Sequence, residues 1–186
     1  DVQNISTTMI PRVYGRSYAI EAAVHVPEGG AEGVLVAFAD FIGGFALWVD
    51  ENGLLNHTYQ FLGVDTYRQT STEPVPTGDV LLKMQFDAVQ AKPGTGGHVT
   101  LWAGDKQIGE GDIPRTISLL FTTYAGMDIG RDNGAVVDRS YAAKAPFPFT
   151  GTIQKVVFDI KPHLEHEEAE LHEAAQHANA AHALSA

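Results

Sequence analysis

Cysteine is absent from this 186-residue sequence, and basic residues are scarce. Without cysteine the chain can form no disulfide, no thiolate metal site and no cysteine nucleophile, but this absence suits either side of a membrane and leaves the localisation open. Only 12 Lys and Arg stand against 23 Asp and Glu, which gives a formal net charge of −11. Because the charge opposes binding to phosphate-rich surfaces, we predict that neither nucleic acid nor a membrane is a partner.

Long apolar runs are also missing. No stretch approaches the roughly 18 residues that a membrane-spanning helix needs, and no signal-peptide pattern is visible. The length suits one domain with its own core, or one such domain plus an appendage. Because the first residue is Asp1 rather than Met, we expect the chain to be a piece of a longer protein.

What the sequence does contain is a pattern of short strands. Residues 34–39 and 45–49 are apolar on both faces, which is typical of strands covered on both sides, and Gly43-Gly44 between them allows close backbone approach. Residues 18–26 alternate between apolar and polar, as in a half-exposed strand. Further strands are predicted at 54–62, 66–72, 80–86, 99–103, 107–112, 117–123 and 149–160.

Strands thus recur at intervals of about 8 to 15 residues without intervening helices, which is the pattern of an antiparallel β-sandwich. We therefore predict an all-β domain over residues 17–161, preceded by a polar lead-in segment over residues 1–16. The sequence period changes after residue 161, so residues 162–186 form a separate unit.

The C-terminal unit predicts a helix. Residues 162–186 contain no Gly, no β-branched residue and no Lys or Arg, and Pro162 with early Glu residues suits a helix start. Its apolar stripe is narrow, and we expect Leu164 and Leu171 to dock on the sandwich or on another copy of the chain. The tail also holds five of the eight histidines, which we interpret as a solvated polar face because no HExxH motif is present.

A resemblance to a known family rests on several strings that occur in one order. They are AEGVL (31–35), GGFALWV (43–49), YQFLG (59–63), GTGG (94–97), IPRT (113–116), IGRDNG (129–134) and FTGTIQKV (149–156). Their order and spacing resemble the C-terminal region of long bacterial arylsulfatases, which belong to the alkaline-phosphatase-like sulfatase superfamily. The resemblance covers roughly residues 1–160 and implies a concanavalin-like, jelly-roll β-sandwich that follows a large catalytic domain.

The family's catalytic groups do not carry over to this chain. Its nucleophile lies in a C/S-x-P-x-R motif and is oxidised to formylglycine, and its calcium ion is bound by the catalytic domain. Here there is no cysteine, and no serine is followed by x-Pro-x-Arg. The resemblance therefore implies a non-catalytic accessory domain, without a cofactor of its own, that packs on or shapes a sulfatase catalytic domain and aids oligomerisation. A free-standing carbohydrate-binding or self-association module is the alternative.

Two sets of side chains are candidate binding sites. Asp128, Asp132, Asn133 and Asp138 offer oxygen ligands of the kind that calcium takes, but their spacing is not that of an EF-hand, and Asp-Asn-Gly is also turn chemistry. We favour the turn.

The second set consists of aromatic residues in polar strands and loops. Tyr59, Tyr67, Trp102, Tyr124 and Tyr141 could form a stacking surface for sugar rings, with Arg131 available for an anionic group. The alternative, which we favour, is that the aromatic residues cap the core or meet a catalytic domain and that Arg131 forms an ion pair.

Overall fold

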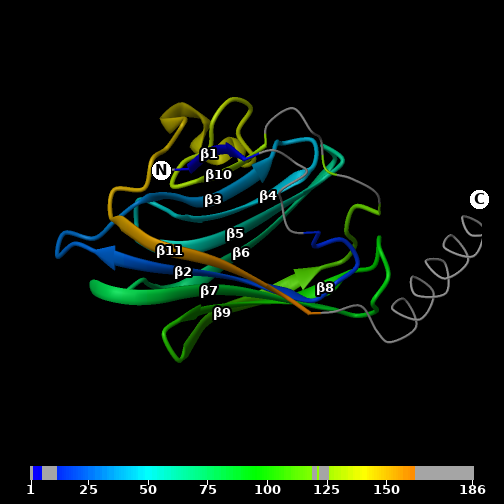
Figure 1. Cartoon of the computed structure of the whole chain (residues 1–186), viewed down its shortest axis with the longest axis horizontal. Coiled ribbons are helices and arrows are strands. Elements are labelled where there is room, and N and C mark those ends of the chain that lie inside the picture. Colours follow the sequence, from blue (N-terminus) through cyan, green and yellow to red (C-terminus); the bar gives the residue numbers. More distant parts are fainter. Residues whose placement is uncertain (1, 6–11, 119–120, 122–125, 162–186) are drawn as a thin grey trace, which may run out of the picture.

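The computed structural model describes residues 2–5, 12–118, 121 and 126–161, and shows two antiparallel sheets packed face to face (Figure 1). The six-stranded sheet has the order β1 (Val2–Ile5), β10 (Met127–Ile129), β3 (Gly33–Ala39), β4 (Gly44–Val49), β5 (Leu54–Phe61) and β6 (Asp65–Pro74). The five-stranded sheet has the order β11 (Thr152–Ile160), β2 (Tyr18–Val26), β7 (Gly78–Ala88), β8 (Gly97–Ala103) and β9 (Lys106–Ile113). The predicted all-β, jelly-roll sandwich is confirmed.

Helical structure among the described residues is confined to a 3₁₀ helix, η2 (Arg139–Lys144). It lies in the segment over residues 130–151 that connects β10 to β11, on the outer side of the six-stranded sheet (Figure 1). We call this segment the β10–β11 excursion. In this part of the chain no helix is long and apolar enough to cross a membrane. The helix predicted over residues 162–186 falls outside the described residues.

The core lies between the sheets and follows from the alternation of the strands. Along β2, the side chains of Tyr18, Ile20, Ala22, Val24 and Val26 are all buried, as the alternation predicts. At one end of the sandwich, aromatic rings pack edge to face around Phe121, whose ring contacts those of Phe38, Phe45 and Tyr59. Such ring pairs add directional packing to the burial of apolar surface.

Strands β3 and β4 are buried on both faces, as their continuous apolar sequence predicts. The close backbone approach predicted for the Gly43-Gly44 pair is found at Gly44, where a Cβ atom would collide with the carbonyl oxygen of Phe38. Only glycine fits this site without a backbone shift.

The two long sides of the sandwich differ. Along one side β6 meets β9, and Cβ atoms at Gly109 and Gly111 would lie 3.0 Å from Ser71 and 2.9 Å from Gln69. These glycines therefore let the sheets close tightly. Along the other side, a groove of about 560 Å³ remains between β10 and β11. Its apolar lining comes from Met127, Ile129, Phe149, Ile153, Val156 and Phe158.

Three details differ from the sequence-based expectations. Val2–Ile5, assigned to the lead-in segment, forms the edge strand β1 against β10. Ile117 and Ser118, predicted to begin a strand, have no strand structure, and the backbone N–H of Ile117 instead donates to the hydroxyl of Tyr59. In β11 a register shift after Ile153 puts this residue against the core together with Val156, whereas strict alternation predicts opposite faces.

Candidate functional site

The outer face of the six-stranded sheet is largely covered by the β10–β11 excursion. Val136, Val137, Tyr141 and Phe147 of the excursion pack with Trp48 of β4, and all five side chains are buried. The indole of Trp48 contacts the rings of Tyr141 and Phe147 edge to face. This second apolar cluster explains why β3 and β4 are hydrophobic on both faces.

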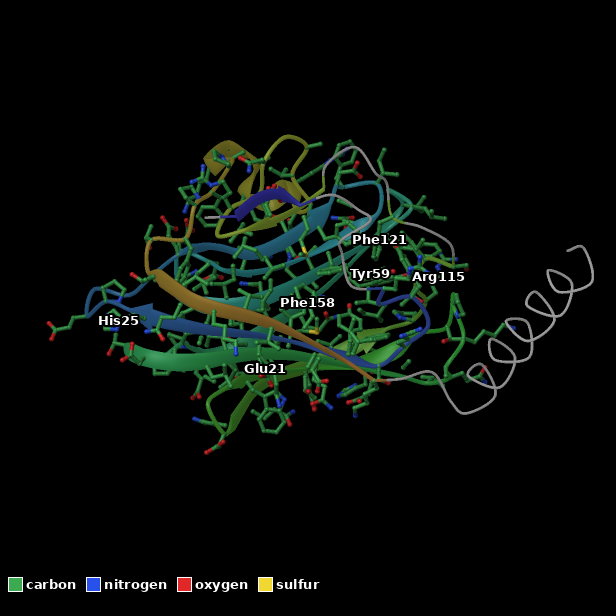
Figure 2. All side chains as sticks on the ribbon, in the orientation of Figure 1. Glu21, His25, Tyr59, Arg115, Phe121 and Phe158 are labelled. Carbon is green, nitrogen blue, oxygen red and sulfur yellow. The ribbon has the colours of Figure 1, made fainter. Side chains whose placement is uncertain are left out.

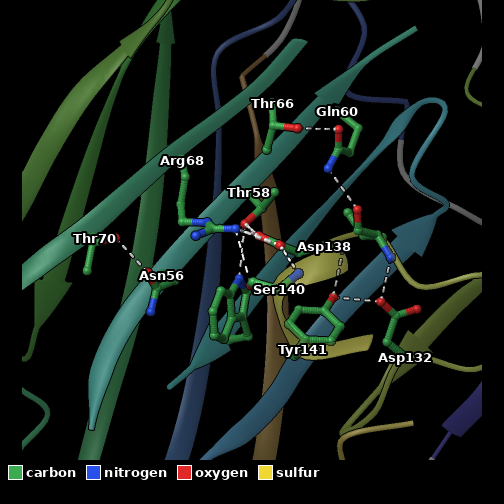
Figure 3. Close-up of polar contacts among 12 residues, drawn as sticks. Asn56, Thr58, Gln60, Thr66, Arg68, Thr70, Asp132, Asp138, Ser140 and Tyr141 are labelled. Carbon is green, nitrogen blue, oxygen red and sulfur yellow. Dashed lines mark hydrogen bonds and ion pairs between the residues drawn. The ribbon is translucent and has the colours of Figure 1, made fainter. Parts of the chain in front are cut away.

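A polar network centred on Asp138 fastens the excursion to the sheet (Figure 3). The Asp138 carboxylate accepts hydrogen bonds from the Thr58 hydroxyl (2.6 Å), from the Arg68 guanidinium (2.6 Å) and from the backbone N–H of Ser140 (2.9 Å). The Trp48 indole N–H in turn donates to Thr58. Burial raises the pKa of Asp138, but these hydrogen bonds outweigh it and hold the pKa below its usual value.

Asp132 lies in the same excursion, but its pKa shifts in the opposite direction from that of Asp138. Its carboxylate accepts hydrogen bonds from the Tyr141 hydroxyl (2.6 Å) and from the backbone N–H of Val137 (2.7 Å) (Figure 3). Burial is the largest cause that raises the pKa of Asp132, to about 6, and the nearby carboxylates of Asp128 and Asp138 add to it, although the two hydrogen bonds act in the opposite direction. The group is a structural acid whose charge is costly at neutral pH.

The four residues proposed as oxygen ligands do not converge on one point. The Asp128 carboxylate accepts the backbone N–H of Asn133 (3.0 Å), while Asp132 and Asp138 receive the hydrogen bonds described above. Among the described residues, no group of three or more His, Cys, Asp or Glu side chains is placed to hold a metal ion. The turn interpretation agrees with this geometry, since the carboxylates accept backbone N–H groups.

The proposed aromatic set is also dispersed. Tyr59 lies in the core between the sheets, whereas Tyr141 is buried in the cluster on the outer face of the six-stranded sheet. Tyr67 is on β6, where its hydroxyl donates to Asp65 (3.3 Å). Arg131 is half-buried in the excursion. Tyr59 and Tyr67 are cross-strand partners on β5 and β6, but the structure does not bring all four residues to one surface, and Tyr124 lies outside the described residues.

Trp102 remains as the aromatic residue on an open polar face. It lies on β8 and points outward from the five-stranded sheet, where no excursion of the described chain packs over it. Cross-strand pairing places Glu21, Lys83 and Trp102 side by side on β2, β7 and β8. The next row along the same face contains Gln85, Thr100 and Glu110. We call these six residues the Trp102 face.

The Trp102 ring is held in place by its neighbours on this face. Its indole N–H donates to the Thr100 hydroxyl (2.9 Å), and the Lys83 ammonium lies 5.0 Å from the ring centroid. Two rows farther along the same face of β8, the ring nitrogens of His98 contact Asp112 (2.7 Å) and Glu110 (3.5 Å). These carboxylates raise the pKa of His98, and the largest cause is the hydrogen bond that the Asp112 carboxylate accepts from the imidazole. The result is a half-exposed indole surrounded by donors and acceptors.

Most residues of this face were not among the sequence candidates. The sequence showed that Lys83 and Gln85 alternate with apolar residues in one strand, and it identified Trp102 in another. It contained no signal for the register that places Lys83 directly opposite Trp102, since register depends on turn geometry and on the packing of the other face.

Comparison with known proteins adds information about the fold. No family model matches the sequence, and no curated protein matches it. Among solved structures, the chain is similar to the CBM40 module of the Ruminococcus gnavus IT-sialidase, with a TM-score of 0.53 and 16% identity over 82% of this chain and 80% of that one. The likeness is one of fold.

Two further structures of that module give similar values. The complex with α2,3-sialyllactose has a TM-score of 0.52 and 16% identity, and covers 82% of this chain and 80% of that one. The complex with α2,6-sialyllactose has a TM-score of 0.51 and 14% identity, and covers 84% of this chain and 82% of that one. At this level of identity the comparison supports the jelly-roll architecture and transfers no binding residue.

Proposed function

We propose that this chain is a carbohydrate-binding β-sandwich module that binds sugar on the Trp102 face. The observation that carries the proposal is the half-exposed indole of Trp102, which lies on an open sheet face beside Lys83 and Glu21. Sugars combine apolar C–H surfaces with hydroxyl groups, and an indole with charged and amide neighbours complements both. The fold shared with a sialidase CBM40 module supports the same function.

The charges on this face favour an uncharged sugar. Lys83 is the one cation among the six residues, whereas Glu21 and Glu110 are anionic. Beside Glu110, the Asp112 carboxylate is opposed by His98, whose pKa it raises. A ligand carboxylate or sulfate meets net negative charge here, which opposes binding. We therefore expect lactose to bind at least as tightly as sialyllactose.

A glycan array followed by calorimetry with lactose and α2,3-sialyllactose tests this proposal. Removing the ring in Trp102→Ala is expected to weaken sugar binding by about five- to tenfold, because a stacked ring contributes about 1–1.5 kcal/mol. The control is Tyr67→Ala, which removes a half-buried aromatic residue from the other sheet. Absence of binding to any glycan, or equal losses in the two variants, would refute a sugar site at Trp102.

A second function is favoured by the groove between β10 and β11. Its lining residues include Ile129 and Gly130, from the string IGRDNG, and Phe149, Ile153 and Val156, from the string FTGTIQKV. Two of the strings behind the arylsulfatase resemblance thus meet at one partly apolar groove, and exposed apolar surface of this kind often marks an interface. We propose that the accessory role uses this groove to pack against a catalytic domain that itself contains the formylglycine and calcium.

The accessory role has its own test. If a catalytic domain occupies the groove, backbone amides of β11 in the full-length gene product will exchange hydrogen more slowly than in the isolated chain. Val156→Asp should abolish the difference, whereas Val89→Asp, at an exposed loop position outside the groove, should not. Equal exchange in the two proteins would argue against docking at this surface.

A further inference from the structure

An exposed apolar patch lies on two neighbouring loops at one end of the sandwich. Ile42, in the β3–β4 connection, is 44% exposed, and Leu62 and Val64, in the β5–β6 connection, are 57% and 77% exposed. The loops are adjacent, because a Cβ atom at Gly63 would lie 3.6 Å from the Cα of Ile42. We call Ile42, Leu62 and Val64 the loop patch. They are three of the five large hydrophobic residues that are exposed in the described part of the chain.

The backbone presents this patch in a defined conformation. Leu62 has a φ of 53° and Ala39, at the start of the other loop, has a φ of 65°, both in the left-handed region that residues with side chains seldom adopt. The Asp40 carboxylate accepts the backbone N–H groups of Ile42 (2.8 Å) and Gly43 (3.3 Å). Hydrogen bonding thus holds Ile42 outward instead of letting its loop fold over the core.

Two arginines border the loop patch. Arg115 lies 4.3 Å from the Phe61 ring centroid and pairs with Asp65, the neighbour of Val64 (2.5 Å). Arg139 lies 4.2 Å from the ring centroid of Phe41, and among the described residues it has no carboxylate partner. In a chain with a formal charge of −11, this end therefore combines apolar surface with an arginine that is available to an acid.

We propose that the loop patch is the docking site of the chain's own C-terminal segment, residues 162–186. That segment contains five Glu, no Lys or Arg, and the large apolar side chains Leu164 and Leu171. Leucines suit the apolar patch, and a glutamate suits Arg139. A second copy of the chain would bring its own arginines to the same surface, so charge favours the acidic segment.

The segment also starts at the correct end of the molecule. Ile160, at the end of β11, pairs with Tyr18, and the Tyr18 ring centroid lies 6.2 Å from that of Phe45, three residues after Ile42. Figure 2 shows Arg115 at this end and His25 at the opposite end of the sandwich. Packed sheets are about 10 Å apart, whereas a helix over residues 162–186 would span roughly 37 Å. The segment can therefore cross from one sheet to the patch.

Hydrogen exchange of the full chain, measured by mass spectrometry together with light scattering, tests this proposal. In the wild type we expect protection of residues 162–175 in a monomer. Val64→Asp should reduce that protection by about tenfold or more, because burial of a valine side chain changes a binding equilibrium by at least about tenfold. Arg139→Glu should also reduce the protection, because it replaces the cation that faces the acidic segment with an anion. Val89→Asp is the matched control, because Val89 is also an exposed loop valine (75%) but lies outside the patch.

The same data can overturn the proposal. An unprotected segment in the wild type, or equal protection in the wild type and Val64→Asp, would show that the patch does not bind it. A loss of protection in Val89→Asp as large as in Val64→Asp would point to general acid repulsion. If light scattering shows that the wild type is a dimer and that Val64→Asp is a monomer, the loop patch binds a second copy of the chain and not the C-terminal segment. Unchanged exchange in β2 and β7 serves as the check that every variant folds.

Discussion

Replacing Asp132 with asparagine should stabilise the protein at neutral pH. Asp132 is 1% exposed, and its carboxylate accepts hydrogen bonds from Tyr141 and from the backbone N–H of Val137. Asparagine has nearly the same shape, and its amide oxygen can accept both hydrogen bonds. It also removes a buried negative charge that the carboxylates of Asp128 and Asp138 make less favourable.

The magnitude follows from the raised pKa of Asp132. Burial moves this pKa from 3.8 to about 6, and two units correspond to about 3 kcal/mol of stability. Because the folded state binds the proton more tightly, this stabilisation is complete below the unfolded pKa and is lost as the pH rises through about 6. Asp132→Asn should therefore match the wild type near pH 4 and exceed its free energy of unfolding by about 3 kcal/mol near pH 7.

Urea denaturation of the wild type and of Asp132→Asn at about six pH values between 4 and 7 provides the comparison. The difference between the two curves isolates Asp132, since the other titrating groups are common to both proteins. A pH-independent difference, or a variant that is less stable than the wild type at pH 7, would refute the reasoning. Either result would mean that the carboxylate is ionised at little cost.

Three further predictions concern other parts of the sandwich. Arg68→Ala should lower the free energy of unfolding in urea by about 2–3 kcal/mol, because it leaves the buried Asp138 carboxylate without its cation. Lys106→Ala breaks an exposed ion pair with Glu73 and should lower the free energy of unfolding by less than about 1 kcal/mol. Burial lowers the pKa of His57 to about 4, so the wild type should lose stability as the pH falls from about 6.5 to 4. The urea midpoint of His57→Gln should fall less steeply over this pH range than the midpoint of the wild type, because the glutamine does not titrate. Gly44→Ala should lower the melting temperature by several degrees, since its Cβ would meet a carbonyl oxygen; an unchanged melting temperature would contradict the close approach of the Phe38 carbonyl to Gly44.

Much of the fold could be predicted because strands leave a direct trace in the sequence. The alternation of residues 18–26 corresponds to β2, and the continuous apolar runs around Gly43 correspond to the doubly covered β3 and β4. The sequence did not show what covers their outer face. That cover is the β10–β11 excursion, and its contact with Trp48 joins residues about 90 positions apart. Such non-local packing has no periodic signature.

The candidate site was predictable only in part. Trp102 was identified, but Tyr59 and Tyr141 have the same amphipathic chemistry and prove to be core residues. Residue type does not reveal which face of a strand is exposed to solvent, because a segment far away in the sequence can cover one of the two faces. The partners of Trp102, such as Lys83, depend on strand register, which single strands do not encode.

Two-dimensional NMR of the indole N–H groups during a lactose titration tests the central claim most directly. The chain has only two tryptophans, and they lie on opposite sheets, with Trp102 on the open face and Trp48 buried at 5% exposure. Sugar binding at the Trp102 face is expected to shift the Trp102 signal in a saturable manner and to leave the Trp48 signal in place. Two signals that stay fixed while calorimetry records binding, or a shift of Trp48 alone, would contradict a carbohydrate site on this face.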